Sequence, residues 1–173
     1  KYLVILRDLR DIICSFESLV WKYPQVGYSD MGGEGPPFHH LPFEERMEIY
    51  CRDTLSLLGR PLQKLPHLIE IVKKYPNNFF ILRHEDFNEK PRETFQMIYQ
   101  FLGDQYFEHD FDNIPKSDYY EHDTVYRSLV NHKTATKLKK LEPRWPKVMT
   151  EKQSKMVIDN NRWYYETFYP ELV

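Results

Sequence analysis

The sequence predicts an α/β fold in which a parallel sheet is flanked by helices. Two continuous apolar runs, at residues 2–6 and 79–82, have the length and composition of strands that are buried on both faces. Each run is followed by a polar stretch and then by a helical pattern, and further helical patterns lie between the two. Strand, polar turn and helix occurring twice in this way is typical of a parallel sheet.

A helix is expected to begin directly after the first strand. Asp8 is a suitable N-cap, and Asp11 adds a carboxylate to the first turn, where it interacts favourably with the helix dipole. The helix is expected to end near Tyr23, because a residue before proline, here Pro24, disfavours the helical conformation. Apolar residues recur at helical spacing at Leu9, Ile12, Ile13, Phe16, Leu19 and Val20.

A long loop and two helices are predicted between the strands. Residues 24–42 contain four of the six glycines and four of the twelve prolines, so they form a loop long enough to be functional. A helix is then expected from Pro42 to around Gly59–Pro61, where glycine and proline stop it. Another helix is expected at about 64–75, ending before Pro76.

The second strand is followed by a polar turn and a well-defined helix. Residues 83–90 are polar and predict the turn, whereas residues 91–102 have a helical apolar face and a glycine stop at Gly103. Residues 103–121 are acidic and aromatic and have no regular pattern.

The C-terminal part is predicted to be helical in two places. Residues 131–145 are basic and partly helical by composition. The final helix opens with Thr150 and Gln153, the spacing of a capping box, and is expected to run to about Tyr169.

Length and composition limit the class of protein. The 173 residues are expected to form one domain, residues 1–173, and the formal net charge of −2 gives no basic field for collecting nucleic acid. No apolar run approaches the roughly 20 residues that a membrane span requires. The only cysteines, Cys14 and Cys51, lie on or beside apolar stripes, so we expect free thiols and a reducing, cytoplasmic location.

The junction between the first strand and the first helix has the chemistry of an anion site. Ligands of open parallel sheets bind at the carboxyl ends of the strands, and Arg7 lies at such an end. Ser15 follows eight residues later, about two helical turns along, so its hydroxyl points in roughly the same direction around the helix axis as the helix start. A guanidinium and a hydroxyl placed in this way can hold one phosphate. The alternative is an ion pair of Arg7 with Asp8 or Asp11, with Ser15 an ordinary helix-face residue.

The stretch VILRDLRDIICSF resembles the 3′-phosphate-binding motif of the sulfotransferases that use 3′-phosphoadenosine 5′-phosphosulfate (PAPS). Arg7, Asp8, Asp11 and Ser15 match the motif, and Leu9 stands where the family usually has proline. FFILRHEDFNEKPRETFQMIYQFLG is similar to the family's next strand, turn and helix, and RWPKVMTEKQSKMVIDNNRWYYETFYPEL is similar to its C-terminal segment. The resemblance covers almost the whole chain and implies the P-loop-like sulfotransferase fold.

Two parts of the family pattern have no counterpart in this chain. The family's 5′-phosphosulfate loop, a P-K-S-G-T-T-like turn with a catalytic lysine, precedes the arginine motif, and so does its catalytic histidine. We therefore expect this chain to be the C-terminal portion of the domain, completed by an N-terminal portion, with no catalytic residue identifiable in it. His39 and His40 follow the motif instead of preceding it; the alternatives to a catalytic role are a pair of loop histidines or a metal pair.

The resemblance implies further contacts to the nucleotide. The family closes over the 3′-phosphate with a basic loop, and Lys139 and Arg144 lie in the corresponding span, where Lys133 and Lys137 are further candidates. The alternative for these residues is a solvated basic helix face. His84 replaces a tyrosine of the family and is expected either to contact the adenine or to cap the turn.

The resemblance implies that the complete protein transfers a sulfuryl group from PAPS to an acceptor hydroxyl or amine and releases PAP, without a metal. The acceptor is expected to be a small molecule or a carbohydrate that binds near residues 24–42 and 103–121. One alternative is a non-catalytic PAP-binding or protein-interaction module of the same fold. The other is a different phosphate-handling α/β transferase, such as a small-molecule kinase, which the lack of a glycine-rich P-loop disfavours.

Overall fold

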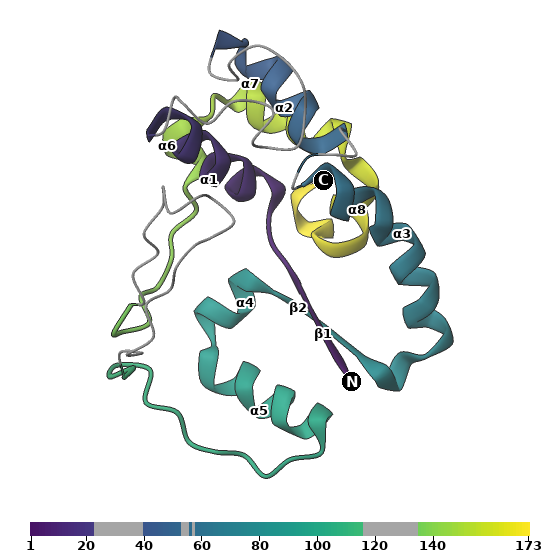
Figure 1. Ribbon diagram of the computed structural model, residues 1–173, viewed down its shortest axis with the longest axis vertical. Coiled ribbons are helices and arrows are strands. Elements are labelled where there is room, and N and C mark those ends of the chain that lie inside the picture. Colours follow the sequence, from purple (N-terminus) through teal and green to yellow (C-terminus); the bar gives the residue numbers. More distant parts are fainter. Residues whose placement is uncertain (23–39, 53–55, 57, 116–134) are drawn as a thin grey trace. The chain divides into compact units, whose positions relative to one another are not determined.

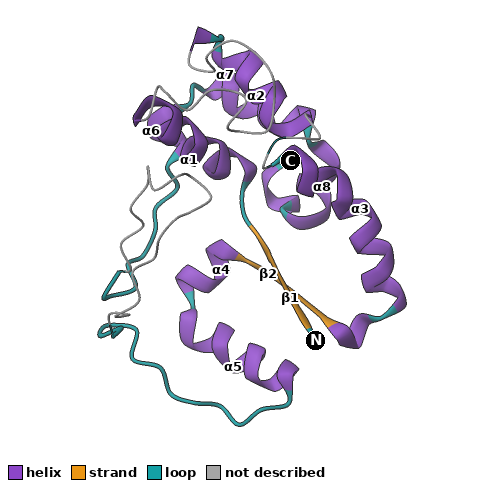
Figure 2. Ribbon diagram, in the orientation of Figure 1, coloured by secondary structure: helices purple, strands orange, loops and turns teal. Residues whose placement is uncertain are grey.

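A computed structural model describes residues 1–22, 40–52, 56, 58–115 and 135–173. The chain divides into two compact units: unit 1 comprises Lys1–Arg7 and Lys74–Glu142, and unit 2 comprises Asp8–Lys73 and Pro143–Val173. Figure 1 follows the chain through both units, and Figure 2 marks their helices and strands. The single domain over residues 1–173 stays a prediction.

Unit 1 is built on a parallel pair of strands. β1 (Tyr2–Leu6) pairs with β2 (Phe79–Arg83) in a register that joins Tyr2 to Phe79 and Leu6 to Arg83 (Figure 2). Both predicted strands and their parallel direction are therefore confirmed, but the predicted burial on both faces is wrong for β1, in which Tyr2, Leu3 and Ile5 are exposed. Among the described residues the sheet has these two strands in a mostly helical structure, which is compatible with the α/β class.

Two helices follow β2. α5 (Pro91–Leu102) has the predicted bounds, and Gly103 ends it in the left-handed conformation with a φ of 84°. The predicted polar turn is wrong, because α4 (His84–Glu89) occupies most of it. Two side-chain contacts support this short helix: Arg83 Nε lies 2.9 Å from Asp86 Oδ2, and Asn88 Nδ2 donates to the carbonyl oxygen of His84 at 2.8 Å.

The remainder of unit 1 is held by cross-links between two irregular segments. The N–H of Ile114 donates to the carbonyl oxygen of Thr136, and the N–H of Leu138 donates to that of Phe111, each at 2.8 Å. An ion pair of 2.5 Å joins Lys137 to Asp112. Residues 135–144 contain no helix, so their predicted helical character is wrong; the backbone groups of Thr136 and Leu138 bond to another segment instead. Residues 131–134 lie outside the described residues.

Unit 2 is helical and contains most of the buried side chains. The fully buried core includes Leu9 and Ile13 of the first helix, together with Tyr50, Val157 and Tyr165. The first helix contacts the fourth and fifth helices of this unit, α6 and α7. The helices are α1 (Leu9–Lys22), α2 (Phe43–Arg52), α3 (Gly59–Lys74), α6 (Trp145–Val148), α7 (Glu151–Asn160) and α8 (Arg162–Phe168). Short 3₁₀ turns follow at Pro76–Asn78 in unit 1 and Pro170–Leu172 in unit 2.

The predicted stop at Gly59–Pro61 is wrong, because these residues begin α3. The hydroxyl oxygen of Ser56 accepts a hydrogen bond from the N–H of Gly59 at 2.7 Å, which satisfies a donor at the helix start. Pro61 lies in the first turn of the helix, where its missing N–H costs nothing. Residues 53–55 and 57 lie outside the described residues.

The predicted final helix is divided at Asn161. The side-chain Nδ2 of Asn161 donates to the carbonyl oxygen of Val157 at 2.9 Å, the acceptor that its own backbone N–H would use in a continuous helix. The backbone N–H instead donates to the carbonyl oxygen of Ile158 at 3.1 Å. Competition by the side chain therefore separates α7 from α8.

The capping box at the start of α7 is confirmed. Thr150 Oγ1 accepts from the N–H of Gln153 at 3.2 Å, and Gln153 Oε1 accepts from the N–H of Thr150 at 2.9 Å. We predict that Thr150→Ala lowers the free energy of unfolding by about 1 kcal/mol, because one N-terminal donor loses its partner. Urea denaturation followed by circular dichroism measures the loss. Thr150→Ser retains the oxygen and should match the wild type within a few tenths of a kcal/mol; an equal loss in both variants would contradict the capping role.

The two cysteines are free and buried, as predicted. Burial raises the pKa of each thiol to about 11, so both are protonated near neutral pH. No helix among the described residues combines the length and the apolar character that crossing a membrane requires.

Candidate phosphate-binding site

Two of the predicted site residues lie at one edge of the sheet in unit 1. Leu6 pairs with Arg83 at the end of the parallel register, so Arg7 and His84, the residues that follow the two strands, leave the sheet at the same edge. The Arg7 side chain is half-buried, and its Nε is fully buried. His84 begins α4, and its ring nitrogens lie 3.1 and 3.2 Å from Asn88 Nδ2. A cationic side chain is thus placed at the edge where parallel sheets bind ligands.

The start of α1 in unit 2 is capped as predicted. Asp8 Oδ1 accepts from the backbone N–H of Arg10 at 2.9 Å, which is the N-cap hydrogen bond. The same carboxylate also contacts the Arg10 guanidinium, with 2.5 Å between Asp8 Oδ2 and Arg10 Nη2. It accepts a further hydrogen bond of 2.9 Å from the hydroxyl of Tyr165. Burial, together with the Asp8 charge, raises the pKa of Tyr165 far above its usual value, so this hydroxyl remains a donor.

Arg10 connects α1 to the C-terminal helices, a role that the sequence did not indicate. Its guanidinium carbon lies 4.1 Å from the ring centre of Trp145, and its Nη1 donates to Ser154 Oγ at 3.2 Å. Arg10 is buried, and its charge is compensated by Asp8. This network fixes the first turn of α1 against α6 and α7, and it therefore fixes the helix that carries Ser15.

Asp11 brings Arg144 next to that helix. Asp11 Oδ1 accepts from the backbone N–H groups of Arg144 at 2.9 Å and Trp145 at 3.2 Å. Ser15 lies four residues after Asp11, so it occupies the same face of α1 one turn further along. Both Ser15 and Arg144 are exposed. Unit 2 therefore places the backbone of Arg144 beside the face of α1 that carries Ser15.

The remaining candidates are less constrained. Lys139 is exposed in unit 1, directly after the segment that bonds to Phe111, and Lys137 is engaged by Asp112. His40 is exposed, whereas His39 and Lys133 lie outside the described residues.

The five predicted donors thus form two groups. Arg7, His84 and Lys139 belong to unit 1, whereas Ser15 and Arg144 belong to unit 2. Each group offers cationic and hydrogen-bonding side chains of the kind that hold phosphate. The convergence of Arg7 and Ser15 on one phosphate stays a prediction.

A model of the sulfotransferase domain family matches residues 1–164. The chain belongs to the sulfotransferase domain family. The match runs from β1 into α8, so the resemblance noted in the three sequence stretches is confirmed, and membership supports sulfotransfer as the general function. Comparison with curated proteins and with solved structures found no match.

Unit 1 also contains a cavity. It has a volume of about 510 Å³, and five of its eleven lining residues have aromatic side chains. We call it the aromatic cavity; its walls include Phe87, Phe95, Phe107, His109, Phe111 and Leu138. Three of these six residues come from the segment 103–121, one of the two places where the acceptor was expected to bind.

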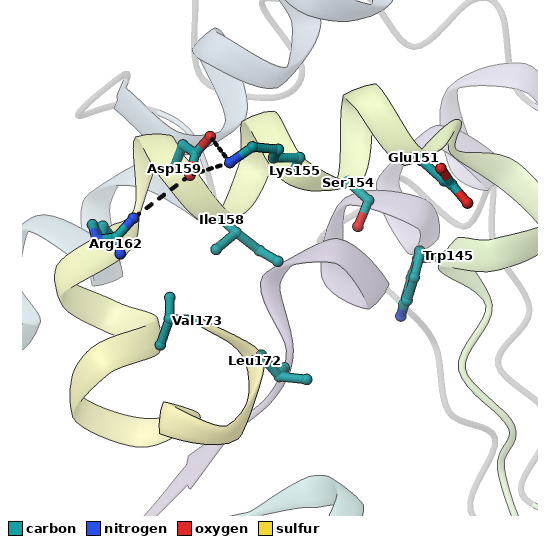
Figure 3. A pocket seen from close by; sticks show the side chains of 9 residues that line it. All are labelled: Trp145, Glu151, Ser154, Lys155, Ile158, Asp159, Arg162, Leu172 and Val173. Atoms are coloured by element: carbon teal, nitrogen blue, oxygen red, sulfur yellow. Dashed lines mark hydrogen bonds and ion pairs between the residues drawn. The ribbon is translucent and has the colours of Figure 1, made fainter.

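Unit 2 contains a smaller cavity of about 340 Å³ beside α7 and α8 (Figure 3). Its cationic side chains already face an anion: Lys155 Nζ lies 2.8 Å from Asp159 Oδ2, and Arg162 Nη1 lies 3.8 Å from Asp159 Oδ1. None of the five predicted donors lines it. We therefore do not assign a nucleotide phosphate to this cavity.

Proposed function

We propose that the complete protein transfers a sulfuryl group from PAPS to a hydroxyl or amine of an acceptor. In this proposal, residues 1–173 supply the part of the domain that holds the 3′-phosphate. The observation that carries it is the position of Arg7, directly after β1 at the carboxyl edge of a parallel strand pair, in a chain of the sulfotransferase family.

Each candidate residue has a binding role in this proposal. Arg7 donates paired N–H groups to the 3′-phosphate, and Ser15 donates its hydroxyl from the first turns of α1. Lys139 and Arg144 add positive charge near that phosphate, and His84 contacts the adenine. These residues hold the donor nucleotide in register for transfer. In the transfer itself, the bond between sulfur and the leaving phosphate oxygen breaks as the acceptor atom bonds to sulfur and loses its proton.

The groups that act on the reacting bonds are proposed to lie in an N-terminal portion of the domain. The exposed apolar side chains of β1 support further strands: Tyr2, Leu3 and Ile5 are 62%, 44% and 65% exposed. A two-stranded sheet is only marginally stable by itself, so pairing or packing with additional strands would stabilise it. We therefore propose that the complete domain has a P-loop-like fold, in which additional strands extend the sheet and helices flank it. Residues 1–173 alone are not expected to catalyse transfer.

Calorimetric titration of the chain with PAP and with adenosine 5′-monophosphate tests the phosphate site. The two ligands differ by the 3′-phosphate, so a site for that group predicts at least tenfold tighter binding of PAP, because a charge-assisted contact is worth about 1.5–3 kcal/mol. Equal affinities, or no binding of PAP, would contradict the proposal.

A non-catalytic PAP-binding module is the second candidate. The observation that favours it is the lack of a P-K-S-G-T-T-like stretch within residues 1–173. The sequence upstream of Lys1 in the complete gene separates the two candidates: a strand followed by such a loop favours the enzyme. This module would bind PAP in the same titration, so only turnover by the complete protein distinguishes it functionally.

A further inference from the structure

We propose that the cavity in unit 2 binds a small primary ammonium ion that also carries a carbonyl oxygen and a branched apolar group, as an amino-acid amide does. The cavity lies beside α7 and α8 (Figure 3). Its volume of about 340 Å³ lies within the range of about 300–1,000 Å³ that is usual for small-molecule sites. This inference goes beyond the proposed sulfotransfer and does not rest on it.

One face of α7 presents three kinds of side chain to the cavity. Glu151, Ser154 and Ile158 all line it, and their spacing places them on the same face of the helix, about one turn apart. The order along this face is a carboxylate, a hydroxyl and an apolar group. A ligand that matches this order has a cation at one end, a hydrogen-bond acceptor in the middle and an apolar group at the other end.

Ser154 supplies a buried hydroxyl whose proton is available to a ligand. The residue is 5% exposed, and its Oγ accepts a hydrogen bond of 3.2 Å from Nη1 of the buried Arg10. A guanidinium only donates, so the hydroxyl proton has to point away from it. Among the described residues, none accepts this proton. Because a buried donor without a partner is costly, a carbonyl oxygen in the cavity would gain this hydrogen bond.

The charges around the cavity favour a cation over an anion. Lys155 Nζ lies 2.8 Å from Asp159 Oδ2. Arg162 Nε lies 2.9 Å from Glu166 Oε1, so both cationic side chains of the wall already have an anion. Glu151 forms no ion pair with any residue that the structure describes. An anionic ligand would have to compete with carboxylates for these cations, whereas an ammonium ion would gain Glu151 as a partner.

The remaining walls of the cavity are apolar. Figure 3 shows Ser154 and Ile158 pointing from α7 toward the side where Trp145 and Leu172 lie. The side chains of Trp145, Ile158 and Leu172 are half-buried, so part of their apolar surface is in water. A branched aliphatic group would cover this surface, which stabilises binding in proportion to the apolar area buried. The indole is also held in place, because the Arg10 guanidinium carbon lies 4.1 Å from its ring centre.

Titration of the full chain with leucinamide tests the inference at about pH 6.5, where the α-ammonium group is charged. NMR of the isotope-labelled protein follows the indole N–H signals of Trp21, Trp145 and Trp163. We expect a saturable shift of the Trp145 signal, whereas the other two tryptophans do not line the cavity and should keep their signals in place. N-acetyl-leucinamide lacks the charge and should bind about two- to fivefold more weakly. Glycinamide lacks the apolar group and should bind at least tenfold more weakly.

Glu151→Gln tests the carboxylate without disturbing the core, because Glu151 is exposed. It is expected to weaken leucinamide binding about two- to fivefold, the usual value of an exposed ion pair. Glu45→Gln is the matched control. Glu45 is also an exposed carboxylate in the first turn of a helix of unit 2, but it does not line the cavity, so the affinity should stay unchanged. Ser154→Ala is expected to weaken binding about two- to tenfold, because one hydrogen bond is lost.

Absence of a saturable shift of the Trp145 signal would overturn the inference. Equal affinities of the Glu151 and Glu45 variants, or binding of N-acetyl-leucinamide as tight as that of leucinamide, would do the same. If Ser154→Ala fails to fold, which circular dichroism checks, the comparison of Glu151→Gln with Glu45→Gln still decides. None of the residues proposed to hold PAP lines this cavity, so failure of either proposal leaves the other standing.

Discussion

Replacing Arg46 with methionine is expected to lower the free energy of unfolding by about 3–5 kcal/mol, the usual cost of leaving one member of a buried ion pair alone. Arg46 Nη2 lies 2.5 Å from Glu17 Oε2, and Arg46 Nε lies 2.9 Å from Glu17 Oε1. The two side chains are 7% and 5% exposed, and the Tyr50 hydroxyl is a further donor to Glu17 at 3.0 Å. Arg46→Met leaves the Glu17 carboxylate buried between α1 and α2 without its cation.

Arg52→Met is the matched control, because it makes the same substitution on the same helix. Arg52 pairs with Glu48 at 2.9 Å, but the side chains are 66% and 42% exposed, so the expected loss is below about 1 kcal/mol. Urea denaturation of both variants measures the difference. Adding Glu17→Leu to Arg46→Met removes the stranded charge and should recover much of the loss. Similar losses of unfolding free energy for Arg46→Met and Arg52→Met would show that the buried ion pair contributes no more to stability than the exposed one.

The features predicted correctly from the sequence depend on neighbouring residues. Apolar runs identified both strands, and the spacing of apolar residues identified α1 and α5 within a residue or two of their ends. The caps at Asp8, Thr150 and Gly103 were also predictable, because a cap joins residues no more than about four positions apart. Local signals of this kind need no knowledge of the tertiary fold.

The errors arise where a distant or competing partner decides the structure. Asn161 divides the final helix because its side chain takes the carbonyl oxygen of Val157, although an asparagine at that point is compatible with a continuous helix. Residues 135–144 have a composition suited to a helix, yet the carbonyl oxygen of Thr136 and the N–H of Leu138 bond to Ile114 and Phe111. Composition does not reveal such pairings.

The location of two candidate site residues could be predicted from the sequence, but the contacts that support the site could not. Parallel strands imply a shared carboxyl edge, so the common location of Arg7 and His84 follows from two strand assignments. The supporting contacts do not follow from the sequence. Arg10 looked like an ordinary charged residue of an amphipathic helix, and only the fold brings Trp145 and Ser154 to it. Asp11 was noted for the helix dipole, whereas its carboxylate in fact holds the N–H groups of Arg144 and Trp145.

Replacing Arg7 with alanine is expected to weaken PAP binding about 10- to 150-fold. The estimate follows from the loss of one charge-assisted contact, worth about 1.5–3 kcal/mol. Arg7→Lys keeps the charge but loses the paired N–H donors, so an intermediate affinity is expected. The affinity for adenosine 5′-monophosphate should remain unchanged in both variants, because that ligand lacks the 3′-phosphate. Isothermal calorimetry of each variant with both ligands measures these effects.

Arg52→Ala removes the same charge far along the sequence from the strand edge and should leave PAP binding unchanged. If it weakens PAP binding as much as Arg7→Ala does, the effect is one of overall charge and the site assignment fails. The convergence of Arg7 and Ser15 has its own test in a double-mutant cycle with Ser15→Ala. Two donors to one phosphate should be coupled by at least about 0.5 kcal/mol, whereas separate sites should give additive losses. Additive losses would therefore mean that the guanidinium and the hydroxyl do not share a ligand, although both match the resemblance to the 3′-phosphate motif.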